Sequence, residues 1–99
     1  MYAVIYQFDV IQGLENDFEV LWKLVTEAFI QHAGGLGSRL HKNETGSYIA
    51  YAQWPDKKAW ETARQKLPKT AIENLQRMNG YCEEITVLFN MDVKNDLLK

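Results

Sequence analysis

The sequence predicts one α+β domain whose elements follow the order β-α-β-β-α-β. Segments rich in aromatic and β-branched residues occur at each end of the chain and as a pair in its middle. Helical stretches separate this pair from the two ends. The chain has 99 residues, 46% hydrophobic and 24% charged, which suffices for one modest core and no second domain. We therefore expect an antiparallel four-stranded sheet with the helices on one face, the ferredoxin-like arrangement.

The first half of the pattern is a strand followed by a long helix. Residues 2–10 are β-branched and aromatic and are predicted to form the first strand, and Gly13 marks the turn after it. A helix is predicted over about 15–32, because its apolar residues recur at helical spacing. These residues are Phe18, Leu21, Trp22, Val25 and Phe29. The glycine pair at 34–35 should end this helix, since glycine reaches the left-handed conformation at no steric cost.

A hairpin is predicted in the middle of the chain. Residues 36–42 are expected to form the second strand and residues 48–54 the third. The segment Asn43–Ser47 between them is short, polar and contains a glycine, as is typical of a tight turn. The two strands should therefore pair directly.

The second helical region begins at Asp56, whose carboxylate can cap the free amides of a first helical turn. This helix is predicted to run to about Lys66, where Pro68 interrupts it. A further helical stretch is predicted over about 69–79, and the last strand over 84–92.

The third strand has an unusual feature, because it carries aromatic or apolar side chains on both of its faces. Side chains alternate along a strand. Tyr48, Ala50, Ala52 and Trp54 point one way, and Ile49, Tyr51 and Gln53 point the other. A small sheet covered on one side should be polar on its second side, so this second face either meets another subunit or lines a pocket. Burial of each large apolar side chain contributes about 1.5–3 kcal/mol, which favours a symmetric dimer with the sheets face to face.

Composition excludes several partners. The formal net charge is -2 and no basic tract occurs, so we expect no nucleic-acid partner. No apolar run approaches the roughly 20 residues of a membrane span, and the N-terminus does not resemble a signal peptide. The lone Cys82 cannot form an internal disulfide, which suits a reducing compartment. We therefore expect a cytoplasmic protein without a membrane partner.

Three segments resemble the antibiotic biosynthesis monooxygenase (ABM) family of dimeric α+β barrels. They are the glycine turn Ile11–Gly13, the segment Gly34–His41 and the strand-to-helix junction Tyr51–Trp60. The resemblance implies a single domain over residues 1–99, with a core at about 2–92 and a short tail at 93–99. It also implies a homodimer that forms through the sheet face.

The family includes cofactor-free monooxygenases that act on polycyclic aromatic compounds, haem-degrading enzymes, quinol-handling proteins and members without known activity. Quinone-forming members use a tryptophan at the end of strand three and an aromatic residue in the next helix, and Trp54 and Trp60 fall near these positions, with Trp60 in place of a tyrosine. The family's asparagine falls near Ala50. Haem-degrading members use a histidine in the second helical region, whereas no histidine occurs after His41, which counts against that branch.

The predicted catalytic residues are His41 and Trp54. Histidine titrates near neutrality, so His41 is the best acid/base candidate, and Arg39 on the same strand face can hold a substrate carboxylate or enolate. Aromatic side chains are predicted to line a pocket between the first helix, the second helical region and the sheet: Trp22, Tyr51, Trp54 and Trp60. The alternative is that these aromatics form an ordinary core and that Arg39 and His41 are solvated residues beside the hairpin turn.

Two functions remain open. The first is a monooxygenase that acts on a small aromatic or quinol-like compound with no bound cofactor and no metal; the two histidines stand on different elements, and no Cys/His cluster occurs. The second is a non-catalytic protein, either a small-ligand binder or a dimeric scaffold. The polar content of the pocket discriminates between them. Tyr6 and Tyr81 carry hydroxyls that can either donate to a ligand or be satisfied within the fold.

Overall fold

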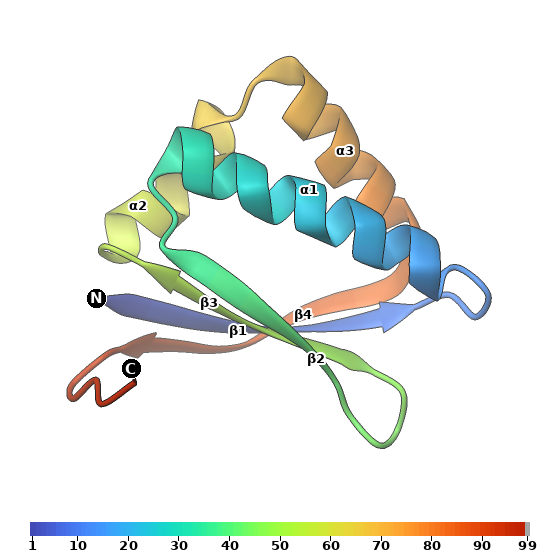
Figure 1. Cartoon of the computed structure of the whole chain (residues 1–99), viewed down its shortest axis with the longest axis horizontal. Helices are drawn as coiled ribbons and strands as arrows, with labels where there is room; N and C mark the ends of the chain where they lie inside the picture. The colour runs from blue at the N-terminus through green and yellow to red at the C-terminus, as the bar shows by residue number, and fades with distance from the viewer. Residues whose placement is uncertain (99) are drawn as a thin grey trace.

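Four antiparallel strands form one sheet in the order β2-β3-β1-β4, and the helices lie together on one of its faces (Figure 1). The computed structural model describes residues 1–98. The predicted fold class and element order are confirmed. The elements are β1 (Tyr2–Val10), α1 (Glu15–Ala33), β2 (Gly37–Lys42), β3 (Tyr48–Trp54), α2 (Lys57–Thr62), the 3₁₀ turn η1 (Ala63–Lys66), α3 (Lys69–Gly80) and β4 (Cys82–Asp92).

The second helical region differs from the sequence prediction in one respect. One helix was expected from Asp56 to about Lys66, but α2 ends at Thr62 and continues as η1. In this last turn Leu67 N–H donates to the carbonyl oxygen of Arg64 at 3.2 Å, the tighter spacing of a 3₁₀ helix. The chain has to leave the helix here because Pro68 follows.

Both predicted helix caps are confirmed. The Asp56 carboxylate accepts a hydrogen bond from the Ala59 backbone N–H at 2.8 Å, so it satisfies a free donor at the start of α2. Gly34 follows the end of α1 with φ at 76°, in the left-handed region that favours glycine. The two caps fix where α1 turns back toward the sheet and where the chain leaves β3 for α2.

The predicted hairpin between β2 and β3 is confirmed. Lys42 pairs with Tyr48 at its closed end, and the Asn43 side-chain oxygen accepts from the backbone N–H groups of Thr45 and Ser47 at 3.1 and 3.0 Å. This local network explains why a short polar segment is sufficient to reverse the chain.

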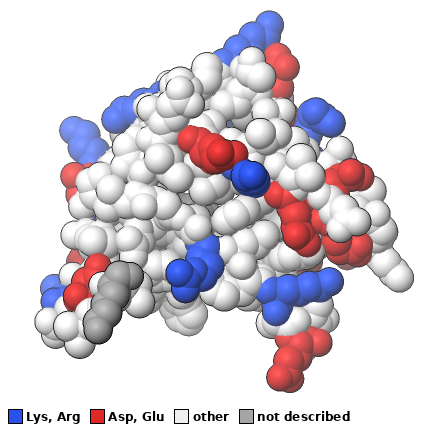
Figure 2. Space-filling model, viewed as in Figure 1, with Lys and Arg blue, Asp and Glu red and all other residues white. Residues whose placement is uncertain are grey.

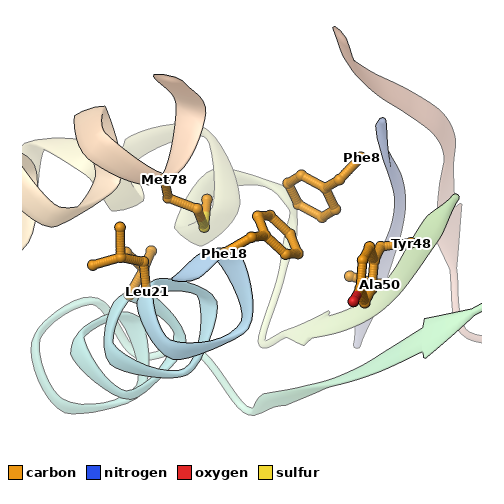
Figure 3. Close-up of a cluster of buried hydrophobic side chains, with 7 residues drawn as sticks. Phe8, Phe18, Leu21, Tyr48, Ala50 and Met78 are labelled. Carbon is orange, nitrogen blue, oxygen red and sulfur yellow. The ribbon is translucent and has the colours of Figure 1, made fainter. Parts of the chain in front are cut away.

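Strand alternation places one apolar row under the helices. The register aligns Tyr6 with Ala50 and Phe8 with Tyr48 on the helix-facing side of β1 and β3. Figure 3 shows the cluster in which Phe18 of α1 packs against this row. The Phe18 ring is 5.1 Å from the Phe8 ring and 5.1 Å from the Tyr48 ring, between centroids. These aromatic contacts hold α1 on the sheet.

The opposite face of the sheet has no covering layer within residues 1–98, and it is apolar at its centre. The register brings together Ile5, Tyr51 and Phe89 across three neighbouring strands, and the Phe89 side chain is 58% exposed. Ile49 and Met91 lie on the same face and are half-buried. The apolar character that the sequence predicted for the second face is therefore present and exposed.

Charged side chains of both signs occur on the face of the molecule that Figure 2 shows. On the face shown in Figure 2, Lys and Arg are interspersed with Asp and Glu, and no continuous basic surface appears. Among residues 1–98, no helix combines the length and the apolar character that crossing a bilayer requires.

The Asp56 cap generates a stability prediction. We expect Asp56→Ala to lower the free energy of unfolding by about 0.5–2 kcal/mol, because the Ala59 N–H then lacks its acceptor. Asp56→Asn keeps a side-chain oxygen and should lose much less. Urea denaturation of the three proteins measures the difference. Equal losses in the Ala and Asn variants would show that the carboxylate acts through its charge and not as a cap.

Candidate functional site

A half-enclosed cavity of about 560 Å³ lies between the helices and the covered face of the sheet. Its size falls within the range of small-molecule sites, roughly 300–1,000 Å³. The walls are mostly apolar and come from the sheet and from all three α-helices. The sheet supplies Tyr6, Phe8, Ala50, Ala52 and Trp54; α1 supplies Trp22, Val25 and Phe29; α2 supplies Trp60; α3 supplies Leu75 and Met78.

Small residues on β3 create this space. Ala50 and Ala52 point toward the helices from the middle of the sheet, where larger side chains would fill the interior. Gly35 and Ser38 also line the cavity, so the path from α1 into β2 adds little bulk. The core is therefore solid near Phe18 and hollow over the two alanines.

Trp54 forms the wall at the end of β3. Its side chain is 4% exposed and packs edge to face on Phe29, with ring centroids 5.6 Å apart. The backbone approaches closely here: a side-chain carbon at Gly35 would lie 3.5 Å from the Trp54 ring. The Trp54 indole nitrogen is enclosed by protein and has no hydrogen-bond acceptor among residues 1–98. Such a buried unsatisfied donor costs about 1–3 kcal/mol.

Tyr6 and Trp60 form a hydrogen bond at the cavity wall. The Trp60 indole nitrogen donates to the Tyr6 hydroxyl at 2.6 Å. Tyr6 lies beside an irregularity in the pairing of β1 with β4, where Ile5 pairs with Phe89 and Tyr6 pairs with Val87. Such bulges redirect side chains. Burial raises the pKa of Tyr6 above its ordinary value, so the phenol stays protonated at neutral pH.

Polar groups are few and lie toward the exposed side. Thr26, Glu61, Arg64 and Asn79 are among the lining residues. Glu61 is the only carboxylate and Arg64 the only cation in the described lining, and both side chains are exposed. No group of three or more His, Cys, Asp or Glu side chains within residues 1–98 is arranged to hold a metal ion.

The structure divides the six predicted site residues between the two faces of the sheet. Trp22, Trp54 and Trp60 meet in the cavity. Arg39, His41 and Tyr51 lie on the opposite face, along a shallow hollow of about 440 Å³ that Leu98 also lines. The exposed His41 has its Nδ1 atom 3.1 Å from the carbonyl oxygen of Ile49. The reason is alternation: Arg39 pairs with Tyr51 on one face, whereas Trp54 points to the other.

The sequence contains an indication of some cavity-lining residues, but it can be interpreted only once the fold is known. Tyr6 lines the cavity and Tyr81 does not, although both were candidate donors. Ala50 and Ala52 share the parity of Trp54, so their small size beside a large aromatic could have indicated a hollow. Glu61 lies in α2 and Arg64 in η1, and the sequence around them gives no indication of a site.

Comparison with known proteins identifies a family and a fold. The model of the antibiotic biosynthesis monooxygenase family matches residues 1–78. The solved structure of SnoaB, a cofactor-independent oxygenase from Streptomyces nogalater, has a TM-score of 0.76 at 17% identity, covering 99% of this chain and 97% of SnoaB. No match was found among curated protein sequences.

Two further structures are similar. An antibiotic biosynthesis monooxygenase has a TM-score of 0.76 at 19% identity, with 96% of this chain and 100% of that chain covered. Rv0793 from Mycobacterium tuberculosis has a TM-score of 0.71 at 14% identity, with 95% and 98% covered. At these identities the likeness establishes the shared fold alone.

The hollow over β3 generates a prediction about Ala52. A larger side chain in a filled core lowers the free energy of unfolding by about 1–3 kcal/mol. We expect Ala52→Leu to lower it by less, because the new side chain enters the cavity. It should also abolish binding of a fluorescent dye with an apolar ring system, such as anilinonaphthalene sulfonate, in the cavity. Ala33→Leu is the matched control, since Ala33 is 3% exposed and does not line the cavity. A larger loss of stability for Ala52→Leu than for Ala33→Leu would contradict a cavity here.

Proposed function

The chain belongs to the antibiotic biosynthesis monooxygenase family, and we propose that it is a monooxygenase that oxidises a small aromatic or quinol-like compound without a bound cofactor. The observation that carries this proposal is the aromatic cavity of about 560 Å³. Trp22, Trp54 and Trp60 offer flat apolar surfaces to a planar ligand, and the phenol of Tyr6 lies among them.

The proposed reaction converts a methylene group next to a phenol ring into a carbonyl. The substrate loses a proton, and the resulting anion transfers an electron to molecular oxygen. The two radicals combine to a peroxide anion, which takes back the proton lost by the substrate, and the resulting hydroperoxide loses water to leave the carbonyl. One oxygen atom enters the product and the other leaves as water, and the substrate supplies all four electrons. No separate reductant is needed, so the protein has only to hold the substrate, promote its ionisation and exclude water.

The cavity residues divide these tasks. The tryptophans and Phe29 provide the dry wall that keeps the anion and oxygen together. We assign proton acceptance to Glu61, because it is the only carboxylate among the described residues that line the cavity, and none of these residues is a histidine. Arg64, the only cation there, favours the anionic form of the substrate.

The proposal predicts oxygen consumption with a polycyclic phenol that carries an oxidisable methylene group. An oxygen electrode should record one molecule of oxygen consumed for each quinone formed, with no release of hydrogen peroxide and no effect of a metal chelator. Trp54→Phe keeps apolar bulk but loosens the wall, so we expect kcat/KM to fall on the order of tenfold. Melting temperatures are compared in parallel, so that loss of fold is recognised.

His41→Ala decides between the two faces of the sheet. Oxygen uptake that survives in this variant and falls in Trp54→Phe supports the cavity. The reverse pattern would place the chemistry on the open face. Tight binding of the phenol without oxygen uptake would identify a non-catalytic ligand binder.

The open face of the sheet is proposed to pair with the same face of a second copy, as in the dimeric α+β barrel that the family resemblance implies. Ile5, Tyr51 and Phe89 form an apolar centre there, and Arg39 and His41 lie beside it. The isologous pairing of identical apolar patches is the commonest way to cover such a face.

A cytoplasmic location is also proposed, supported by Cys82, which is a free cysteine in the structure.

The dimer proposal predicts the effect of a charge at Phe89. Wild-type protein at micromolar concentration should have twice the monomer mass in sedimentation equilibrium, and Phe89→Asp should have the monomer mass because a buried charge without a partner is costly. Val20→Asp is the matched control: Val20 is 61% exposed on α1, against 58% for Phe89, and lies away from the open face. A stable wild-type monomer would overturn the proposal.

A further inference from the structure

We infer that Tyr6 is the residue that hydrogen-bonds to an oxygen atom of the ligand in the cavity, and that Trp60 positions the Tyr6 hydroxyl for this role. The inference rests on the proposed function of the cavity and narrows the ligand class: the ligand is an aromatic compound that carries a carbonyl or ionised phenol oxygen. A bare hydrocarbon of the same shape lacks the group that the site recognises.

The hydrogen bond between Trp60 and Tyr6 determines which proton is available. A tyrosine hydroxyl has one hydrogen to donate and lone pairs to accept. The Trp60 indole donates to the Tyr6 oxygen at 2.6 Å, and this bond joins residues 54 positions apart in the chain. Within residues 1–98, no oxygen accepts the hydrogen of the Tyr6 hydroxyl. Trp60 therefore fixes the orientation of the Tyr6 oxygen as an acceptor, and the Tyr6 hydroxyl hydrogen is free to be donated.

The residues around Tyr6 leave room in the cavity for a ligand next to its hydroxyl group. Tyr6 pairs with Ala50 across β1 and β3 on the face that lines the cavity. Directly paired residues have Cβ atoms about 4.5–5.5 Å apart, so the short Ala50 side chain leaves open space beside the Tyr6 ring. The irregular pairing with β4 at Tyr6 is the kind of feature that redirects a side chain toward a site.

Trp54 is less suited to contact the ligand through a hydrogen bond. Its indole nitrogen is enclosed by protein, so a ligand has to displace neighbouring atoms to reach it. Tyr6 is only half-buried and lines the cavity directly. The raised pKa of Tyr6 keeps its phenol neutral, so that it acts as a hydrogen-bond donor rather than as a base. A donor at this position stabilises negative charge that develops on the ligand oxygen during oxidation.

The test compares fluorenone with fluorene, two ligands without a phenol ring, of which fluorene has a methylene group in place of the fluorenone carbonyl. Binding to the full-length protein is measured by quenching of tryptophan fluorescence and checked by calorimetry. We expect Tyr6→Phe to bind fluorenone about three- to tenfold more weakly than wild type and fluorene equally well, which corresponds to the loss of one hydrogen bond. Trp60→Phe should weaken fluorenone binding in the same direction, because the hydroxyl loses its orientation. Tyr81→Phe is the control for loss of a tyrosine hydroxyl outside the cavity.

Three other results overturn the inference, and they differ in what they say about the proposed function. Equal losses for both ligands in Tyr6→Phe would show that the Tyr6 ring acts by packing. Unchanged fluorenone binding in Tyr6→Phe would leave the aromatic cavity standing but assign the ligand oxygen to another donor. Failure of the wild-type protein to bind either ligand would remove the proposed function together with the inference.

Discussion

The alternation of side chains along the four strands is the constraint on which the rest of this structure depends. A strand sends successive side chains to opposite faces, and here both faces are apolar. The helices cover one face only, so the same alternation that supplies the core also leaves Phe89 exposed and Ile5 and Tyr51 half-buried on the open face. Core, cavity and open face are three consequences of one pattern.

The covered face is divided into a solid part and a hollow part by the size of its residues. Phe8 and Tyr48 meet Phe18, and their ring contacts anchor α1. Further along β3, Ala50 and Ala52 stand where larger rings would fill the interior, and the cavity lies over them. The size of the residues along β3 therefore decides where the covered face is filled and where it is open.

Few polar groups line the cavity, so each of them matters for ligand recognition. The Trp60 indole is satisfied by Tyr6, whereas the Trp54 indole is enclosed without an acceptor. Buried polar groups are normally paired. The two tryptophans therefore differ in role: Trp60 positions Tyr6, whereas Trp54 forms a wall of the cavity. Glu61 and Arg64 at the exposed side add charge where water can still screen it.

The sequence by itself determined the features that depend on neighbouring residues. Helical and strand periodicity, the Asp56 cap, the Gly34 stop and the turn at Asn43 all act within a few positions, so the element order, the hairpin and the family resemblance could be predicted. Only the tertiary structure decided the strand register and which face the helices cover, because these depend on contacts between distant segments. Register set Tyr6 opposite Ala50, and packing brought Trp60 to Tyr6. His41 and Trp54 lie on one hairpin but on opposite faces, because His41 pairs with Ile49, whose parity along β3 is opposite to that of Trp54.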